Sequence, residues 1–266
     1  MISHLRHSGL IIRTYVRLGM LNFMQYRGEF FIAVINAVIT LLAQVIGLWV
    51  IFSQTATLDG WTSAGMMLLV GIHFMISGLL GMVIRPSVEA MMEGIRLGTF
   101  DFTLTKPADS QLLASVQRIS PAALADSVLG LGVIIWAGVQ LDSVTPLGVL
   151  AFVITLICGV VIVYSFILLL GTCAFWFVKL DNIMAIFGSV FGQAGRWPVT
   201  IFPGWLRVVL TFVIPVGFAV TVPAQALSGT LDLPTTLLSV GVAILFFVGS
   251  RVFWFFALRR YTGASA

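Results

Sequence analysis

The sequence predicts an all-α integral membrane protein that crosses the bilayer six times, and three observations carry this prediction. Hydrophobic residues make up 59% of the 266-residue chain and charged residues only 9%, whereas a soluble domain carries about 25% charged residues. Apolar segments of about 20 residues, the length that a helix needs to span a bilayer, recur along the chain. Basic residues gather at the ends of these segments, as orientation signals do. The length leaves no room for an additional soluble domain of ordinary size.

The expected spans are the uncharged or nearly uncharged segments of the chain. The second is expected to end at Arg85-Pro86, and the fifth is interrupted by Arg196 and Pro198. Prolines also break residues 203–225, which favours a re-entrant hairpin that enters and leaves on one face, with a kinked span as the alternative. The six expected spans are 30–54, 62–84, 122–141, 146–178, 183–202 and 235–258.

The distribution of Lys and Arg predicts the orientation. Twelve of the fourteen basic residues fall in segments that would share one face, and loops 55–61, 142–145 and 226–234 have none. The basic face is expected to be cytoplasmic, with both termini on it. Residues 1–28 contain arginines at helical spacing, which favours an interfacial helix over a disordered basic tail. No cleavable signal peptide is apparent in this segment.

Several classes of function lack the residues that they require. The chain has no G-x-x-x-x-G-K-[ST] motif to hold nucleotide phosphates, and no H-E-x-x-H or cysteine–histidine cluster to hold a metal. Its scattered basic residues do not indicate nucleic-acid binding. Cys158 and Cys173 are expected to be passive packing residues. We therefore expect a protein that is not an enzyme and holds no cofactor.

Residues 86–118 form a polar segment on the expected cytoplasmic face. Glu89, Glu93 and Arg96 would share one side of a short amphipathic helix, for which Gly98 is a plausible stop. Pro107 then predicts a turn. Such a helix suits the docking of another protein, and an ordinary polar loop with a helical turn explains the spacing equally well.

Polar residues within the apolar segments form two stripes at helical spacing. Asn36, Thr40 and Gln44 recur every four residues in the first span, and His73 and Ser77 do so in the second. Because polar groups avoid lipid, these stripes are expected to face other helices or a water-filled path. Helix packing, a substrate path and a proton relay through His73 all remain open. Residues 188–192 also contain a G-x-x-x-G pattern that could form a dimer seam.

Two stretches resemble the permease subunits of type-2 ABC exporters, and in particular a bacterial subfamily of similar length and unassigned substrate. Residues 95–102 through Lys106-Pro107 are similar to the cytoplasmic loop of that subfamily. Residues 196–198 through 202–207, followed by Ile214-Pro215, resemble its signature after the fifth span. The resemblance implies six spans, a coupling helix after the second and an extracellular re-entrant hairpin before the sixth. It also places Arg196 and Arg207 outside, as exceptions to the charge bias.

The resemblance implies that two permeases, identical or related, pair around a path in the bacterial inner membrane and dock separate ABC ATPase subunits. ATP and Mg would be bound by those ATPases, and the partners of this chain would be protein and membrane lipid. Within the docking region, Glu93 and Arg96 would pair with charges on the ATPase, while Met92, Ile95 and Phe100 would fill its groove. The implied docking residues are Met92, Glu93, Ile95, Arg96, Gly98, Phe100, Asp101, Lys106 and Pro107, and the hairpin residues are Arg196, Pro198, Pro203, Trp205, Arg207 and Pro215.

Two other functions remain as alternatives. One is a non-enzymatic membrane scaffold or assembly protein that works without an ATPase, and a channel is more distant. The weakly charged interior, rich in aromatic residues and methionine, is compatible with lipids, glycolipids or hydrophobic drugs as substrates.

Overall fold

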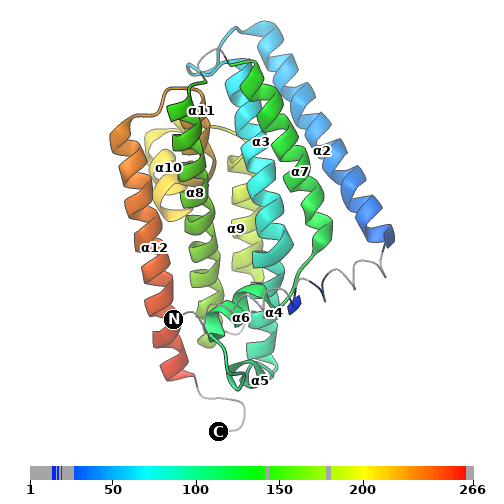
Figure 1. Ribbon diagram of the computed structural model, residues 1–266, viewed down its shortest axis with the longest axis vertical. Helices are drawn as coiled ribbons and strands as arrows, with labels where there is room; N and C mark the ends of the chain where they lie inside the picture. Colours follow the sequence, from blue (N-terminus) through cyan, green and yellow to red (C-terminus); the bar gives the residue numbers. More distant parts are fainter. Residues whose placement is uncertain are drawn as a thin grey trace.

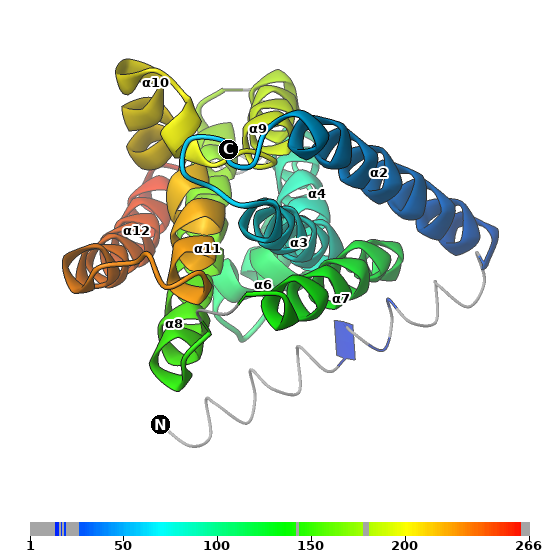
Figure 2. The same ribbon diagram turned by 90° about the horizontal axis from the view of Figure 1, so that it is seen from above.

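The structure, a computed structural model, describes residues 14, 15, 17, 19, 27–141, 144–177 and 181–261. The described part is helical and contains no strand, which confirms the predicted all-α class. The predicted interfacial helix, 1–28, falls mostly outside the described residues. Figures 1 and 2 show a bundle of near-parallel long helices, from which α2 leans away.

Within the described residues, five helical segments are long and apolar enough to cross a membrane, and a sixth candidate is a pair of helices bent by 80°. At one end of the bundle lie the short helices α4–α6 and the end of α12 (Figure 1); we call this the α5 end. The main helices are α2 (Arg27–Gln54), α3 (Ser63–Leu79), α4 (Arg85–Arg96), α5 (Asp101–Leu104), α6 (Ser110–Val116), α7 (Leu124–Val139), α8 (Pro146–Thr172), α9 (Asp181–Ala194), α10 (Gly204–Val208), α11 (Val222–Leu227) and α12 (Leu233–Arg260).

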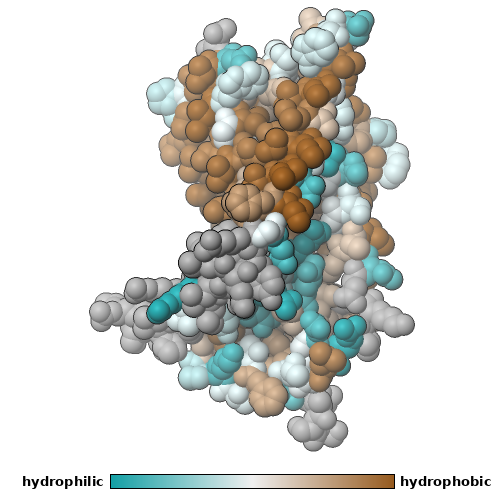
Figure 3. Space-filling model, turned by 90° about the vertical axis from the view of Figure 1, so that its right-hand side faces the viewer, coloured by the Kyte–Doolittle hydropathy of each residue, from teal (hydrophilic) through white to brown (hydrophobic). Residues whose placement is uncertain are grey.

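Several helix starts follow from local sequence. Thr62, Thr145 and Asp232 each precede a long helix, and their side chains accept hydrogen bonds from backbone N–H groups three residues ahead. These caps satisfy donors that the first helical turn leaves unpaired. Figure 3 shows that hydrophobic side chains dominate the surface away from the α5 end, whereas hydrophilic side chains gather towards it.

The helix of the second expected span does not break at Arg85-Pro86 but continues as one helical segment from Ser63 to Arg96, and the end of the span itself stays a prediction. Residues Leu80–Ile84 form a π-helical turn, η1, in which the Arg85 N–H bonds to the Leu80 carbonyl. Pro86 follows in the first turn of α4. Because a π-turn already shifts the backbone hydrogen bonds, the missing N–H of Pro86 does not stop the helix.

The fifth expected span, 183–202, is not one continuous helix. Helix α9 ends at Ala194 after 14 residues, fewer than the roughly 17 that a full span requires. Gly195 and Pro198 interrupt it, and only a short 3₁₀ turn, η4 (Val199–Ile201), follows. The interruption leaves Arg196 in an irregular segment between two helices.

Residues 204–227 form the bent pair. The first limb is α10 continued by the π-helical turn η5 (Val209–Val213), and the second is η6 (Gly217–Thr221) continued by α11. Both limbs lie in the half of the bundle away from the α5 end (Figure 1). This is the shape expected of a hairpin that enters and leaves on one face, and its place in a membrane stays a prediction.

The second limb and the segment before the hairpin are held by specific contacts. The backbone of Gly159 on α8 approaches Ala219 so closely that an added Cβ would lie 2.9 Å from the Ala219 Cα. The Val199 N–H donates to the Thr221 hydroxyl over 3.1 Å. The Trp61 indole N–H donates to the Thr200 hydroxyl, also over 3.1 Å. These contacts fix the segment that carries Arg196.

Helices α3 and α7 pack at close range through small residues. A Cβ added to Gly130 on α7 would lie 2.4 Å from the Met75 backbone nitrogen, and one added to Gly78 on α3 would lie 2.5 Å from the Ser127 nitrogen. Such close backbone approach is typical of helix packing in membranes. This close packing holds α3 in place, and with it the polar residues of the second span, which α3 carries.

Candidate functional site

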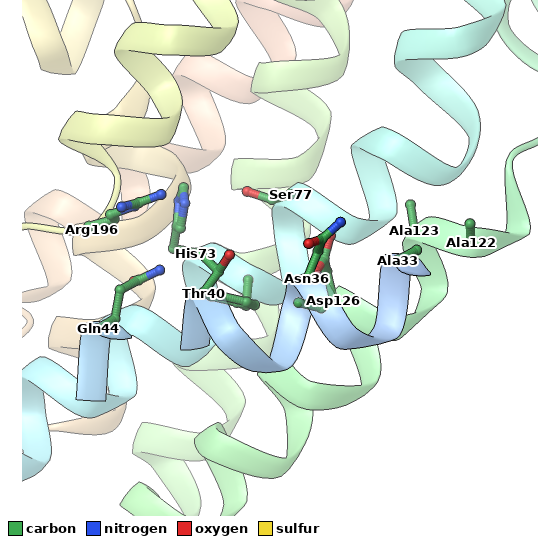
Figure 4. A pocket seen from close by; sticks show the side chains of 12 residues that line it. Ala33, Asn36, Thr40, Gln44, His73, Ser77, Ala122, Ala123, Asp126 and Arg196 are labelled. Carbon is green, nitrogen blue, oxygen red and sulfur yellow. The ribbon is translucent and has the colours of Figure 1, made fainter. Parts of the chain in front are cut away.

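A cavity of 410 Å³ lies between α2, α3, the start of α7 and the segment after α9. The two predicted polar stripes face each other across it, so the structure brings them together. Figure 4 shows Gln44, His73 and Arg196 gathered at one end and Asn36 and Asp126 at the other. The polar residues that line the cavity are Asn36, Thr40, Gln44, His73, Ser77, Asp126 and Arg196.

Three side chains at the Arg196 end have buried polar atoms without a hydrogen-bond partner among the described residues. These atoms are Nδ1 of His73, the Nε of Arg196, and both the oxygen and the nitrogen of the Gln44 amide. Buried polar groups are normally hydrogen-bonded, because leaving one unpaired costs about 1–3 kcal/mol. Their concentration at one point marks this end of the cavity as a candidate binding site.

Arg196 lines this cavity, and its expected place on the external side of the membrane stays a prediction. His73, which lines the same end, stands ten residues into α3, or about 15 Å at a rise of 1.5 Å per residue. The break after α9 carries Arg196 inward, which the sequence spacing does not reveal. Asp126 also lines the cavity, and sequence reasoning missed its part in it.

The other predicted hairpin residues lie along the turns and the first limb. Pro198 and Pro203 directly precede η4 and α10, and Pro215 lies in the bend. Trp205 and Arg207 are exposed on α10. None of these five lines the cavity.

Two of the three glycines in and just after α9 face this chain's own residues, and the dimer seam stays a prediction. A Cβ added to Gly188 would collide with the guanidinium of Arg85, and one added to Gly195 would lie 2.5 Å from Nδ1 of His73. Gly192 alone has open space beside it. Two of the three small residues therefore serve packing of α9 and the following turn against the α3–α4 helix.

The predicted docking residues divide into exposed and buried groups. Glu93 and Arg96 are exposed at the end of α4, as expected, and Lys106 and Pro107 are exposed after α5. The Lys106 ammonium donates to the Tyr15 hydroxyl over 3.2 Å. Ile95 and Asp101 are half-buried. Gly98 ends the helix with a φ of 70°, a backbone conformation that favours glycine.

Met92 and Phe100 are buried inside this chain, so the expectation that they fill a partner's groove is wrong. Phe100 is only 2% exposed and its ring meets those of Phe175, Trp254 and Tyr261 at centroid distances of 5.8, 6.2 and 6.3 Å. The large apolar side chains that this region does expose are Leu97, at 62%, and Phe102, at 73%. Sequence reasoning missed both residues. The sequence shows that neighbouring residues are apolar, but it does not show which of their side chains are buried and which are exposed.

A second set of contacts ties this region to α12. Arg251 donates to both carboxylate oxygens of Asp109 and, over 2.7 Å, to the amide oxygen of Gln111. The Trp254 indole N–H donates to the Ser110 hydroxyl over 3.1 Å. Arg251 therefore ties α12 to the start of α6, and we call this set of contacts the clamp. The Arg251 guanidinium holds the pKa of the Asp109 carboxyl below the usual value.

A charged hollow of 640 Å³ lies beside the exposed end of α4. Three arginines and two glutamates line it, and Arg85 and Glu89 form a loose pair at 3.9 Å on its wall. A surface of this kind can accept a complementary charged segment of another protein. The residues that line it are Arg85, Glu89, Met92, Glu93, Arg96, Arg118, Met184 and Ala185.

The fold and the two surfaces together define a multi-pass helical membrane protein with a polar cavity among its helices and a charged surface at one end. The family model of ABC-2 family transporter proteins matches residues 38–265, and the chain belongs to this family. It is therefore a membrane transport component, a permease of the type-2 ABC class. Comparison with curated proteins found no match.

Proposed function

We propose that this chain is the permease subunit of an ATP-driven exporter and that a separate ATPase docks at the α5 end, which faces the cytoplasm. Family membership supports the need for an ABC ATPase as partner. The basic residues near both ends of the chain and in residues 85–118 support this orientation. A second permease, identical or related, completes the path in the bacterial inner membrane.

The observation that carries the docking proposal is the exposure of Leu97 and Phe102 on an element otherwise anchored in the chain. Phe100, between them, is buried against α12 and the end of α8. The anchored element presents two apolar side chains beside the exposed charges of Glu93 and Arg96. Exposed apolar anchors rimmed by charged groups are typical of protein–protein contact sites.

The anchoring supports transmission of movement as well as binding. A force applied to α5 by the ATPase reaches α12 through the Phe100 aromatic contacts and the Asp109–Arg251 clamp. It reaches α3 directly, since α4 continues that helix. Helices α3 and α12 would therefore move together with the docking element, as a coupled transport cycle requires.

The experiment is co-purification with the ATPase. The double variant Leu97→Asp, Phe102→Asp places charge at the proposed contact and should reduce the recovered ATPase by about tenfold or more, because each such anchor can contribute 1–2 kcal/mol or more. The matched control is Leu233→Asp. Leu233 is 70% exposed and is the first residue of α12, the helix whose last residues lie at the α5 end. This control should bind normally.

Two outcomes would contradict the proposal. If the double variant keeps its ATPase, docking occurs elsewhere on the chain. If no ATPase accompanies the wild-type protein in mild detergent, the scaffold function that works without an ATPase replaces the exporter.

A further inference from the structure

The Arg196 end of the cavity contains a positive charge that no described residue neutralises. Two ion pairs occur among the described residues, Arg85–Glu89 and Arg251–Asp109, and Arg196 is in neither. Its Nε is buried without a partner. A charged side chain at membrane depth is expensive unless it is paired, and such residues usually mark a substrate or ion path.

The groups around Arg196 can all interact with an anion. The unpaired Gln44 nitrogen can donate, and the His73 ring can donate from Nδ1 whenever that nitrogen carries a proton. Figure 4 shows the ends of these two side chains directed to the same end of the cavity as Arg196. Several hydrogen-bond donors and one guanidinium match the multiple oxygens of a phosphate group.

The opposite end of the cavity has the opposite character. Asp126 lines it together with Asn36 and two alanines, Ala122 and Ala123. A carboxylate there repels a second anion, so a phosphate is favoured only beside Arg196.

A second, apolar hollow adjoins the site. Its volume is 230 Å³, and Gln44 and Arg196 line it as well as the polar cavity. The rest of its wall is mostly apolar and includes Leu48, Ile51, Val70 and Trp197. A polar and an apolar space thus meet at Arg196, which suits a molecule with an anionic head and an apolar chain.

We propose that Arg196, Gln44 and His73 bind the phosphate headgroup of an amphiphile whose apolar chain occupies the adjoining hollow. The proposal rests on the exporter function above and names the class of its substrate. Transport then takes a phosphate-bearing lipid through the path, with Arg196 as the group that recognises the head.

The test measures binding to the purified permease without an ATPase, so its outcome does not depend on docking. The probes are dioctanoyl phosphatidic acid, dioctanoylglycerol, which lacks the phosphate, and inorganic phosphate. Wild-type protein should bind phosphatidic acid and bind the other two at least about tenfold more weakly. Arg196→Gln should weaken phosphatidic acid binding by about 10- to 100-fold, the loss of one charge-assisted contact.

Arg207→Gln is the matched control, because Arg207 is exposed on α10 and does not line the cavity. It should bind phosphatidic acid as the wild type does. Gln44→Leu keeps the arginine and removes a donor, so it serves if Arg196→Gln fails to fold, and it should weaken binding about tenfold. Arg196→Gln should also retain its ATPase in co-purification.

Several results would overturn the proposal. Unchanged phosphatidic acid binding in both Arg196→Gln and Gln44→Leu would exclude the site. Inorganic phosphate binding as tightly as phosphatidic acid, with the same sensitivity to Arg196→Gln, would show a site for a free anion instead. Equal binding of dioctanoylglycerol would show that only the apolar hollow is used. In each case normal ATPase co-purification would leave the exporter function standing.

Discussion

Phe100 and Phe102 are two residues apart in one short segment and have opposite environments. Phe100 is 2% exposed within an aromatic cluster, and Phe102 is 73% exposed. From the sequence we predicted a docking segment here and took Phe100 as one of its anchors. A resemblance to a family identifies such a segment, but it does not give the direction in which each side chain points. The tight turn at Gly98 and the helical turn of α5 decide which ring points inward.

The two phenylalanines should therefore differ in their effect on stability. Phe100→Ala removes a buried ring at the α5 end and should cost about 3–5 kcal/mol of unfolding free energy, whereas Phe102→Ala should change it by no more than about 0.5 kcal/mol. Thermal unfolding in detergent measures both. Equal shifts of Tm for the two variants would contradict the burial described for Phe100.

Arg196 shows a similar limit at the residue scale. The resemblance placed Arg196 outside, as an exception to the charge bias, and gave no sign that it lines the cavity with His73 and Gln44. The stripes Asn36–Thr40–Gln44 and His73–Ser77 could be predicted from helical spacing alone. Their meeting with Arg196 could not, because it depends on the irregular segment after α9, whose path is set by contacts such as Val199 to Thr221.

At the scale of elements, the long spans were the most predictable part. Their apolar length located α2, α7, α8 and α12 to within a few residues, apart from the end of α8. The helix boundaries differ from the expected ones where local rules compete. A π-turn carries the helix that follows Ser63 through Pro86, and Gly195 and Pro198 end the helix that starts at Asp181. The link between α6 and α12 joins residues more than 140 positions apart, which no spacing in the sequence indicates.

The clamp between α6 and α12 should control the local stability of the docking region. Arg251→Leu removes its contacts to Asp109 and Gln111 and should increase hydrogen exchange across residues 101–116. Because both partners of the ion pair are partly exposed, the effect should be about 1 kcal/mol. Arg259→Leu, which changes an exposed arginine on the last turn of the same helix, should leave exchange unchanged. Increased exchange in both variants would assign the effect to α12 as a whole.

The clamp also has a defined pH dependence. Arg251 lowers the pKa of Asp109 from its ordinary 3.8, so the stabilisation is complete above that value and is lost as the pH falls through the lowered pKa of the folded state. After correction for intrinsic exchange rates, protection of residues 110–116 should therefore not change between about pH 7 and pH 5. Loss of protection within that range, absent in Asp109→Asn, would show that the Asp109 pKa is raised instead.

The whole molecule places its two candidate functional surfaces on one continuous helix. The segment Ser63–Arg96 carries His73 and Ser77 in the cavity and ends at the exposed charges of the docking region. Movement of the proposed docking element would therefore reach the cavity wall without an intervening loop. Family membership supports the transporter class, and this geometry supports the proposal that ATP hydrolysis in a partner acts on the cavity.

The most direct test of this account is photocross-linking in native membranes. A photoreactive phenylalanine analogue at position 102 should capture an ABC ATPase, which mass spectrometry would identify. The same analogue at position 233, the first residue of α12, should capture none, although the residues at both positions are similarly exposed. Cross-linking of the ATPase at position 233 would contradict docking at the α5 end. So would a functional protein in which position 102 forms no cross-link to the ATPase.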